Sequence, residues 1–150
     1  MKPNYKLSLL MALCLISLTS LLNAQTVVTL NVDTSEIDKH EDLNMTCYFT
    51  GQPEGVSLED FTIEVVVGEE ITWVGQSTVD DTTVEIKKIK YEKGVKLLDG
   101  DDIDSQGDEK FVKAKVDKGN PADAEKYTIH FKVGNKPFKI DPQIRIKPGQ

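Results

Sequence analysis

The chain has 150 residues, of which 39% are hydrophobic, 29% charged and 7% aromatic. This length suits one domain and argues against a multidomain enzyme. The apolar content is too high for a disordered chain. Composition alone therefore indicates a single folded domain.

The first 24 residues have the pattern of a secretory signal peptide. Lys2 and Lys6 precede an apolar run over 7–16, and the segment closes on the small residue Ala24 before Gln25. Such a run is short for a membrane span, so a membrane anchor is the less favoured alternative. We predict cleavage after Ala24. Residues 25–150 then form one secreted domain without a membrane span, in the periplasm or outside the cell of a Gram-negative bacterium.

The mature chain is expected to be strongly acidic. The leader holds two of the 18 basic residues and none of the 25 acidic ones, so the net charge after cleavage is 16 − 25 = −9. An acidic surface repels phosphate backbones, and we expect no nucleic-acid partner. Only Cys47 follows the leader, so no internal disulfide can form and stability depends on the hydrophobic core.

Hydrophobic and polar residues alternate along most of the mature chain, as in strands with one buried and one wetted face. No window of helical length has apolar residues at helical spacing. Seven to nine short strands, separated by Gly, Pro, Asn and Asp, predict an all-β Greek-key sandwich of two antiparallel sheets. The expected strands cover 28–32, 43–49, 61–67, 71–73, 84–86, 112–116, 127–133 and 138–146.

Two irregularities interrupt this alternation. Val84 and Ile86 share one parity and Ile89 the other, so one extra residue at Lys87 or Lys88, a β-bulge, is needed to keep all three apolar side chains inward. Pro142 interrupts the last strand. Because proline cannot donate to a ladder, this strand is predicted to be an edge or to bend there.

Part of the chain resembles the cupredoxins. The segment 61–74 has a strand, a Gly-acid turn and an "I-T-W-V" strand, and 127–131 and 138–146 resemble later strands of that family. The resemblance implies a cupredoxin-like fold. A mononuclear copper site needs two His, a Cys and an axial ligand. Phe131 stands where the family has its Cys, and no His lies between Trp73 and His130, so we expect no electron transfer.

Two other sandwich families share short motifs with this chain. Residues 123–129 resemble the immunoglobulin stretch that contains a tyrosine corner, with Ile129 at the position of the disulfide Cys. Residues 68–73 together with 140–144 resemble bacterial inclusion-body-type β-sandwich proteins, with Ile140 in place of an aromatic residue. All three resemblances imply a sandwich, and none of them supplies a reaction.

The acidic segment 99–109 is the strongest candidate site in the sequence. Its alternating carboxylates and Gly107 have the spacing of a calcium loop. Lys113 stands where an EF-hand loop needs a bidentate Glu, so a solvated hairpin tip is the favoured interpretation and calcium binding is the alternative. No other cofactor is expected. The candidate calcium ligands are Asp99, Asp101, Asp102, Asp104 and Asp108.

The remaining reactive side chains have structural interpretations. His40 and His130 are predicted to be surface residues, because zinc needs three or four ligands. Cys47 is predicted to be a small buried hydrophobe and Trp73 a core residue. The clustered lysines are predicted to mark a wetted sheet face and to protect edge strands; they are Lys87, Lys88, Lys90, Lys113, Lys115 and Lys118.

These features predict a secreted, non-catalytic β-sandwich module with a binding or structural role. It would act through its loops or an open sheet edge on a protein or glycan partner, and its oligomeric state does not follow from the sequence. A calcium-stabilised exported domain using the acidic segment 99–109 is the first alternative. A metal-dependent redox or hydrolytic enzyme is the second and is disfavoured, because no catalytic constellation stands out.

Overall fold

The computed structural model describes residues 24–148, so the predicted leader lies outside the described residues apart from Ala24. Within this range the chain forms ten strands and one short 3-10 helix, which confirms the all-β prediction. No helix of the described residues is long and apolar enough to cross a membrane. The strands are β1 Gln25–Val32, β2 Cys47–Phe49, β3 Thr62–Val65, β4 Glu70–Ser77, β5 Val84–Gly94, β6 Asp102–Asp104, β7 Val112–Lys115, β8 Ala124–Val133, β9 Lys136–Ile140 and β10 Gln143–Ile146.

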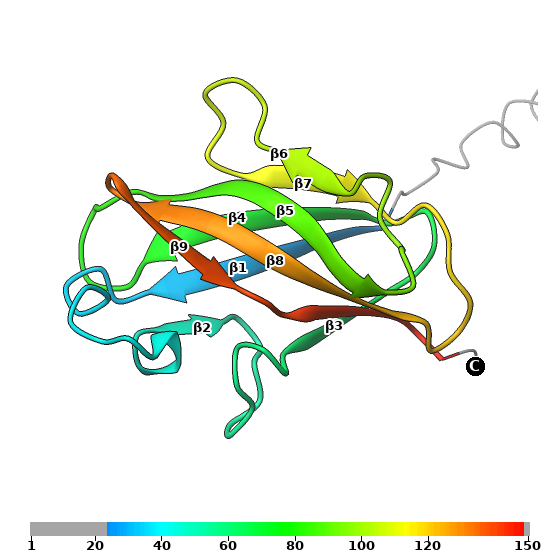
Figure 1. Cartoon of the computed structure of the whole chain (residues 1–150), viewed down its shortest axis with the longest axis horizontal. Coiled ribbons are helices and arrows are strands. Elements are labelled where there is room, and N and C mark those ends of the chain that lie inside the picture. The colour runs from blue at the N-terminus through cyan, green and yellow to red at the C-terminus, as the bar shows by residue number, and fades with distance from the viewer. Residues whose placement is uncertain (1–23, 149–150) are drawn as a thin grey trace, which may run out of the picture.

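The strands form two sheets, which confirms the sandwich. One sheet has four strands in the order β2-β1-β4-β7, and the other has six, ordered β3-β10-β8-β5-β6 with β9 also paired to β8. Figure 1 shows β5 and β8 crossing over β1 and β4. The sheets are mixed rather than purely antiparallel, because β1 pairs parallel with β4 and β3 pairs parallel with β10. Alternation assigns the faces of a strand and carries no information about the direction of its neighbour.

The core between the sheets is built from the predicted inward side chains. Trp73 of β4 and Tyr127 of β8 are fully buried and come from opposite sheets. The Trp73 indole N–H donates to the Tyr127 hydroxyl at 3.1 Å, and the two rings meet edge to face. Cys47 is buried as predicted. A polar bond between the sheets thus lies inside an otherwise apolar core, where indole N–H groups need a partner.

The predicted β-bulge in β5 is confirmed. The pairing of β5 with β8 runs Ile86 to Phe131 and then Lys88 to His130, so Lys87 is the extra residue. Ile86 and Ile89 are both fully buried in consequence. The bulge therefore places two apolar side chains of opposite parity in one core.

The predicted strand 43–49 is shorter than expected, and Met45 lies on the surface instead of in the core. The Asp42 carboxylate accepts the Asn44 backbone N–H at 2.9 Å and caps a 3-10 helix over Leu43–Met45. The helix breaks the alternation, so the Met45 side chain is exposed and the strand begins only at Cys47. A local side-chain-to-backbone bond here competes with the sheet ladder.

The predicted interruption at Pro142 divides the last strand in two. β9 pairs with residues 129–133 of β8, and β10 pairs with residues 124–126 of the same strand. Pro142 lies between them, and its carbonyl accepts the Tyr127 backbone N–H at 3.2 Å. β9 and β10 are therefore one bent continuation along a single edge of β8.

The Gly-acid turn before β4 has a structural role. Gly68 adopts a φ of +91°, which glycine accommodates without strain. The buried carboxylate of Glu69 accepts the Val66 backbone N–H at 2.9 Å and the Thr26 hydroxyl. This carboxylate joins the turn to β1 of the four-stranded sheet, so its hydrogen bonds are used within the fold.

Candidate functional site

The carboxylates of the acidic segment are spread along a strand and paired with lysines. Asp102 and Asp104 belong to β6, which the sequence pattern had assigned to a hairpin tip, and each lies 3.6 Å from Lys88 Nζ. Asp101 lies 2.6 Å from Lys96 Nζ. Asp99 accepts a backbone N–H at 3.3 Å, and Asp108 is exposed.

These five carboxylates are not gathered around one point where a cation could bind. Within residues 24–148, no three His, Cys, Asp or Glu side chains are close enough together to hold a metal ion. Calcium binding by this segment stays a prediction from the sequence.

His40 and Cys47 have surroundings that agree with their structural interpretations. His40 is partly exposed and lies 3.9 Å from Glu36. Burial raises the pKa of the Cys47 thiol to about 11, so the thiolate is scarce at neutral pH. The thiol also contacts the Thr46 hydroxyl inside the fold. Neither residue is placed for nucleophilic chemistry.

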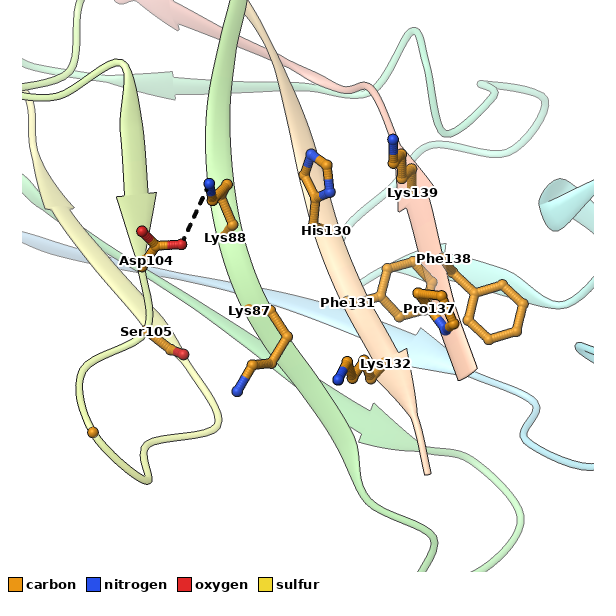
Figure 2. A pocket seen from close by; sticks show the side chains of 11 residues that line it. Lys87, Lys88, Asp104, Ser105, His130, Phe131, Lys132, Pro137, Phe138 and Lys139 are labelled. Carbon is orange, nitrogen blue, oxygen red and sulfur yellow. Dashed lines mark ion pairs between the residues drawn. The ribbon is translucent and has the colours of Figure 1, made fainter. Parts of the chain in front are cut away.

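A groove of about 570 Å³ lies on the outer face of the six-stranded sheet. It crosses β5, β8 and β9, and the chain that leaves β6 forms one wall (Figure 2). Its size is within the range of small-molecule sites. Lysines dominate its charged side chains. The exposed Pro137 and the half-buried Phe138 supply apolar surface, whereas the Phe131 ring is buried in the core. The lining residues are Lys87, Lys88, Asp104, Ser105, Gly107, His130, Phe131, Lys132, Pro137, Phe138 and Lys139.

The β-bulge brings two consecutive lysines to this groove. Residues before and after it, Ile86 and Ile89, point into the core. In a regular strand one of Lys87 and Lys88 would also point inward, whereas the extra residue lets both line the groove. Figure 2 shows Lys87 on β5 beside Lys132 on β8. The irregularity in the sequence therefore contributes directly to the charge of this surface.

The groove lysines differ in their ion pairs. Lys88 faces Asp102 and Asp104, and Lys87 Nζ lies 3.7 Å from Glu85. Lys132 and Lys139 have no carboxylate within 4.0 Å in the described part of the chain. Uncompensated positive charge therefore lies on the side formed by β8 and β9.

His130 lies between these lysines on the outer face, as its parity predicts. Partial burial lowers its pKa, and the nearby charges of Lys139, Lys88 and Lys90 lower it further, while Glu92 opposes them. The imidazole is therefore neutral at pH 7, with hydrogen-bonding capacity and no charge.

The sequence contains the components of this groove, but the pattern does not show that they lie together. The lysines of β5 were interpreted as a wetted face, and Lys132, Pro137, Phe138 and Lys139 were not singled out. The available signal was the parity break at Lys87 together with lysines on the polar side of 127–133. Which strand lies beside β5 was not available from the pattern, because β8 is separated from β5 by two other strands.

Comparison with solved structures shows proteins of similar fold. No protein-family model matches the chain, and no curated protein matches it. The crystal structure of an inclusion body protein (PixA) from Burkholderia cenocepacia superimposes with a TM-score of 0.53 at 12% sequence identity, covering 84% of this chain and 98% of that one. The cupredoxin and immunoglobulin resemblances are not confirmed. At this identity the likeness shows the fold alone: the chain has a β-sandwich similar to that of an inclusion body protein.

Proposed function

We propose that the protein is an exported, non-catalytic binding module whose ligand occupies the groove on the outer face of the six-stranded sheet. The observation that carries this proposal is the groove itself, with a ligand-sized volume, an apolar side and four lysines in its lining. The leader pattern of residues 1–24 supports export.

The interactions of the polar side chains in the groove favour ligand binding over hydrolysis. Ser105, His130 and Asp104 all line it, which invites comparison with a catalytic triad. Asp104 is engaged by Lys88, and no hydrogen bond joins these three side chains in the described residues. Nucleophilic catalysis needs a base within hydrogen-bonding reach of the nucleophile. The arrangement instead presents cations around an apolar surface.

Filling the groove tests the proposal. Ser105 lines it, whereas the next residue, Gln106, is exposed and does not. We expect the neutral fluorescent probe N-phenyl-1-naphthylamine to bind the wild-type protein saturably at one site. Ser105→Trp should weaken this binding by about tenfold or more, because the indole occupies the space of the probe.

The matched control is Gln106→Trp, which adds the same side chain one residue away and should leave probe binding within about twofold of wild type. Equal effects of the two variants, or no saturable binding, would contradict the proposal.

The protein for this experiment is produced with its leader in a Gram-negative host. Mass spectrometry of the periplasmic product should show a chain that begins at Gln25, and retention of the full leader in the cytoplasm would contradict export.

A further inference from the structure

We propose that the ligand of this groove is an amphiphilic organic anion, a soluble compound with an apolar body and a carboxylate or sulfonate group. This inference rests on the proposed function and specifies the chemistry of the ligand. Its basis is the juxtaposition of the uncompensated lysines of β8 and β9 with the apolar surface of Pro137 and the half-buried Phe138 on β9.

The positive charge of the groove is local and contrasts with the rest of the chain. The whole chain carries a net charge of −7, yet the groove is lined by four lysines and one aspartate. That aspartate, Asp104, faces Lys88 on the β5–β6 side. An incoming anion is therefore repelled on that side and attracted by Lys132 and Lys139 on the other.

The apolar component lies beside these two lysines. In the pairing of β8 with β9, Lys132 is opposite Pro137, Phe131 is opposite Phe138, and His130 is opposite Lys139. The rings of Phe131 and Phe138 stack at 5.5 Å, which fixes the Phe138 ring against the core. A ligand body that covers Pro137 and Phe138 would place its anionic group beside β8 and β9, the strands that carry Lys132 and Lys139 (Figure 2).

Charge complementarity selects an anion over a neutral or cationic compound. Two groove lysines, Lys132 and Lys139, have no carboxylate within 4.0 Å in the described residues, so a further positive charge is unfavourable beside them. A carboxylate or sulfonate would offset that repulsion and accept hydrogen bonds from the ammonium groups. The same groove offers little to a cation, since its one aspartate is already engaged.

Two naphthalene probes with the same aromatic skeleton test the charge requirement. 1-Anilinonaphthalene-8-sulfonate carries one sulfonate, and N-phenyl-1-naphthylamine is its neutral counterpart. We expect the sulfonate to bind the full mature protein about tenfold more tightly than the neutral probe. Lys132→Gln and Lys139→Gln should each weaken sulfonate binding by about threefold, and the double variant by about tenfold, with neutral-probe binding unchanged.

Lys118→Gln is the matched control, because it removes the same charge from an exposed position outside the groove. It should change neither affinity by more than about 1.5-fold. Equal affinity for the two probes, or equal effects of the three single variants, would overturn the inference while leaving the neutral-probe binding of the proposed function intact. If the protein self-associates and then binds neither probe, and salt reverses both effects, the occupant of the groove is the acidic segment of a second copy. That result would also overturn the inference of an organic anion.

Discussion

Replacing Trp73 by alanine is expected to lower the free energy of unfolding by about 3–5 kcal/mol. Trp73 is fully buried at the centre of β4, and its indole ring packs edge to face on Tyr127 with centroids 5.7 Å apart. Truncation opens a cavity between the sheets and leaves the Tyr127 hydroxyl without its donor. Urea denaturation followed by circular dichroism measures the loss.

The control for this substitution is Tyr48→Ala, which also removes an aromatic side chain but from a residue that is 52% exposed. Its expected cost is below about 1 kcal/mol. Tyr127→Phe isolates the inter-sheet hydrogen bond, because it keeps the ring and removes only the oxygen; we expect a cost of about 1–3 kcal/mol from the orphaned indole N–H. Similar losses for Trp73→Ala and Tyr48→Ala would contradict the assigned core.

Glu125→Ala is expected to cost about 2–5 kcal/mol through two backbone groups that lose their acceptor. Glu125 is 1% exposed, and one carboxylate oxygen, Oε2, accepts the N–H groups of Leu97 at 2.5 Å and Leu98 at 3.1 Å. Both leucines are themselves buried. The carboxylate therefore fixes the segment between β5 and β6 to β8. Glu125→Gln, which keeps an acceptor oxygen, should cost less than about 2 kcal/mol.

The stabilities of the wild-type protein and of Glu125→Gln should depend differently on pH. Burial raises the pKa of Glu125 above its ordinary 4.5, against the lowering effect of the Leu97 and Leu98 N–H groups. A raised folded-state pKa means that its contribution to stability is complete below about 4.5 and is lost as the pH rises through the folded-state value. Wild type should therefore lose stability relative to Glu125→Gln as the pH rises above 4.5. A constant difference over this rise would contradict the raised pKa.

Sequence reasoning located the core and its irregularities because they depend on parity. Ile86 and Ile89 cannot both face inward without an extra residue, so the pattern predicted a bulge at Lys87 or Lys88, and the strand pairing identifies Lys87. Pro142 lacks an N–H group, so the pattern predicted an edge strand or a bend there, and the structure has a break between β9 and β10. Cys47 and Trp73 were buried as their parity predicts.

The sequence-based predictions were wrong where local hydrogen bonds, or pairing between strands far apart in the sequence, determine the structure. Met45 faces solvent because the Asp42 side chain caps a 3-10 helix that alternation does not reveal. Residues Asp102–Asp104 form β6 because they pair antiparallel with β5, although their residue types are typical of a loop. The groove could not be predicted for a related reason. Lys87 and Lys132 line the same groove only because β5 and β8 are neighbours in the sheet.

Deletion of Lys87 tests most directly the claim that one extra residue lets β5 supply both the core and the lysine groove. Removing it restores strict alternation through Val84, Ile86, Ile89 and Tyr91, at the loss of one hydrogen bond from Ser105 N–H to the Lys87 carbonyl at 2.9 Å. The protein should retain its β-sheet circular dichroism and unfold cooperatively, with a stability loss of about 1–2 kcal/mol. Deletion of Glu85, which inverts the parity of Val84, should unfold it. Unfolding on deletion of Lys87, or equal tolerance of both deletions, would contradict the account.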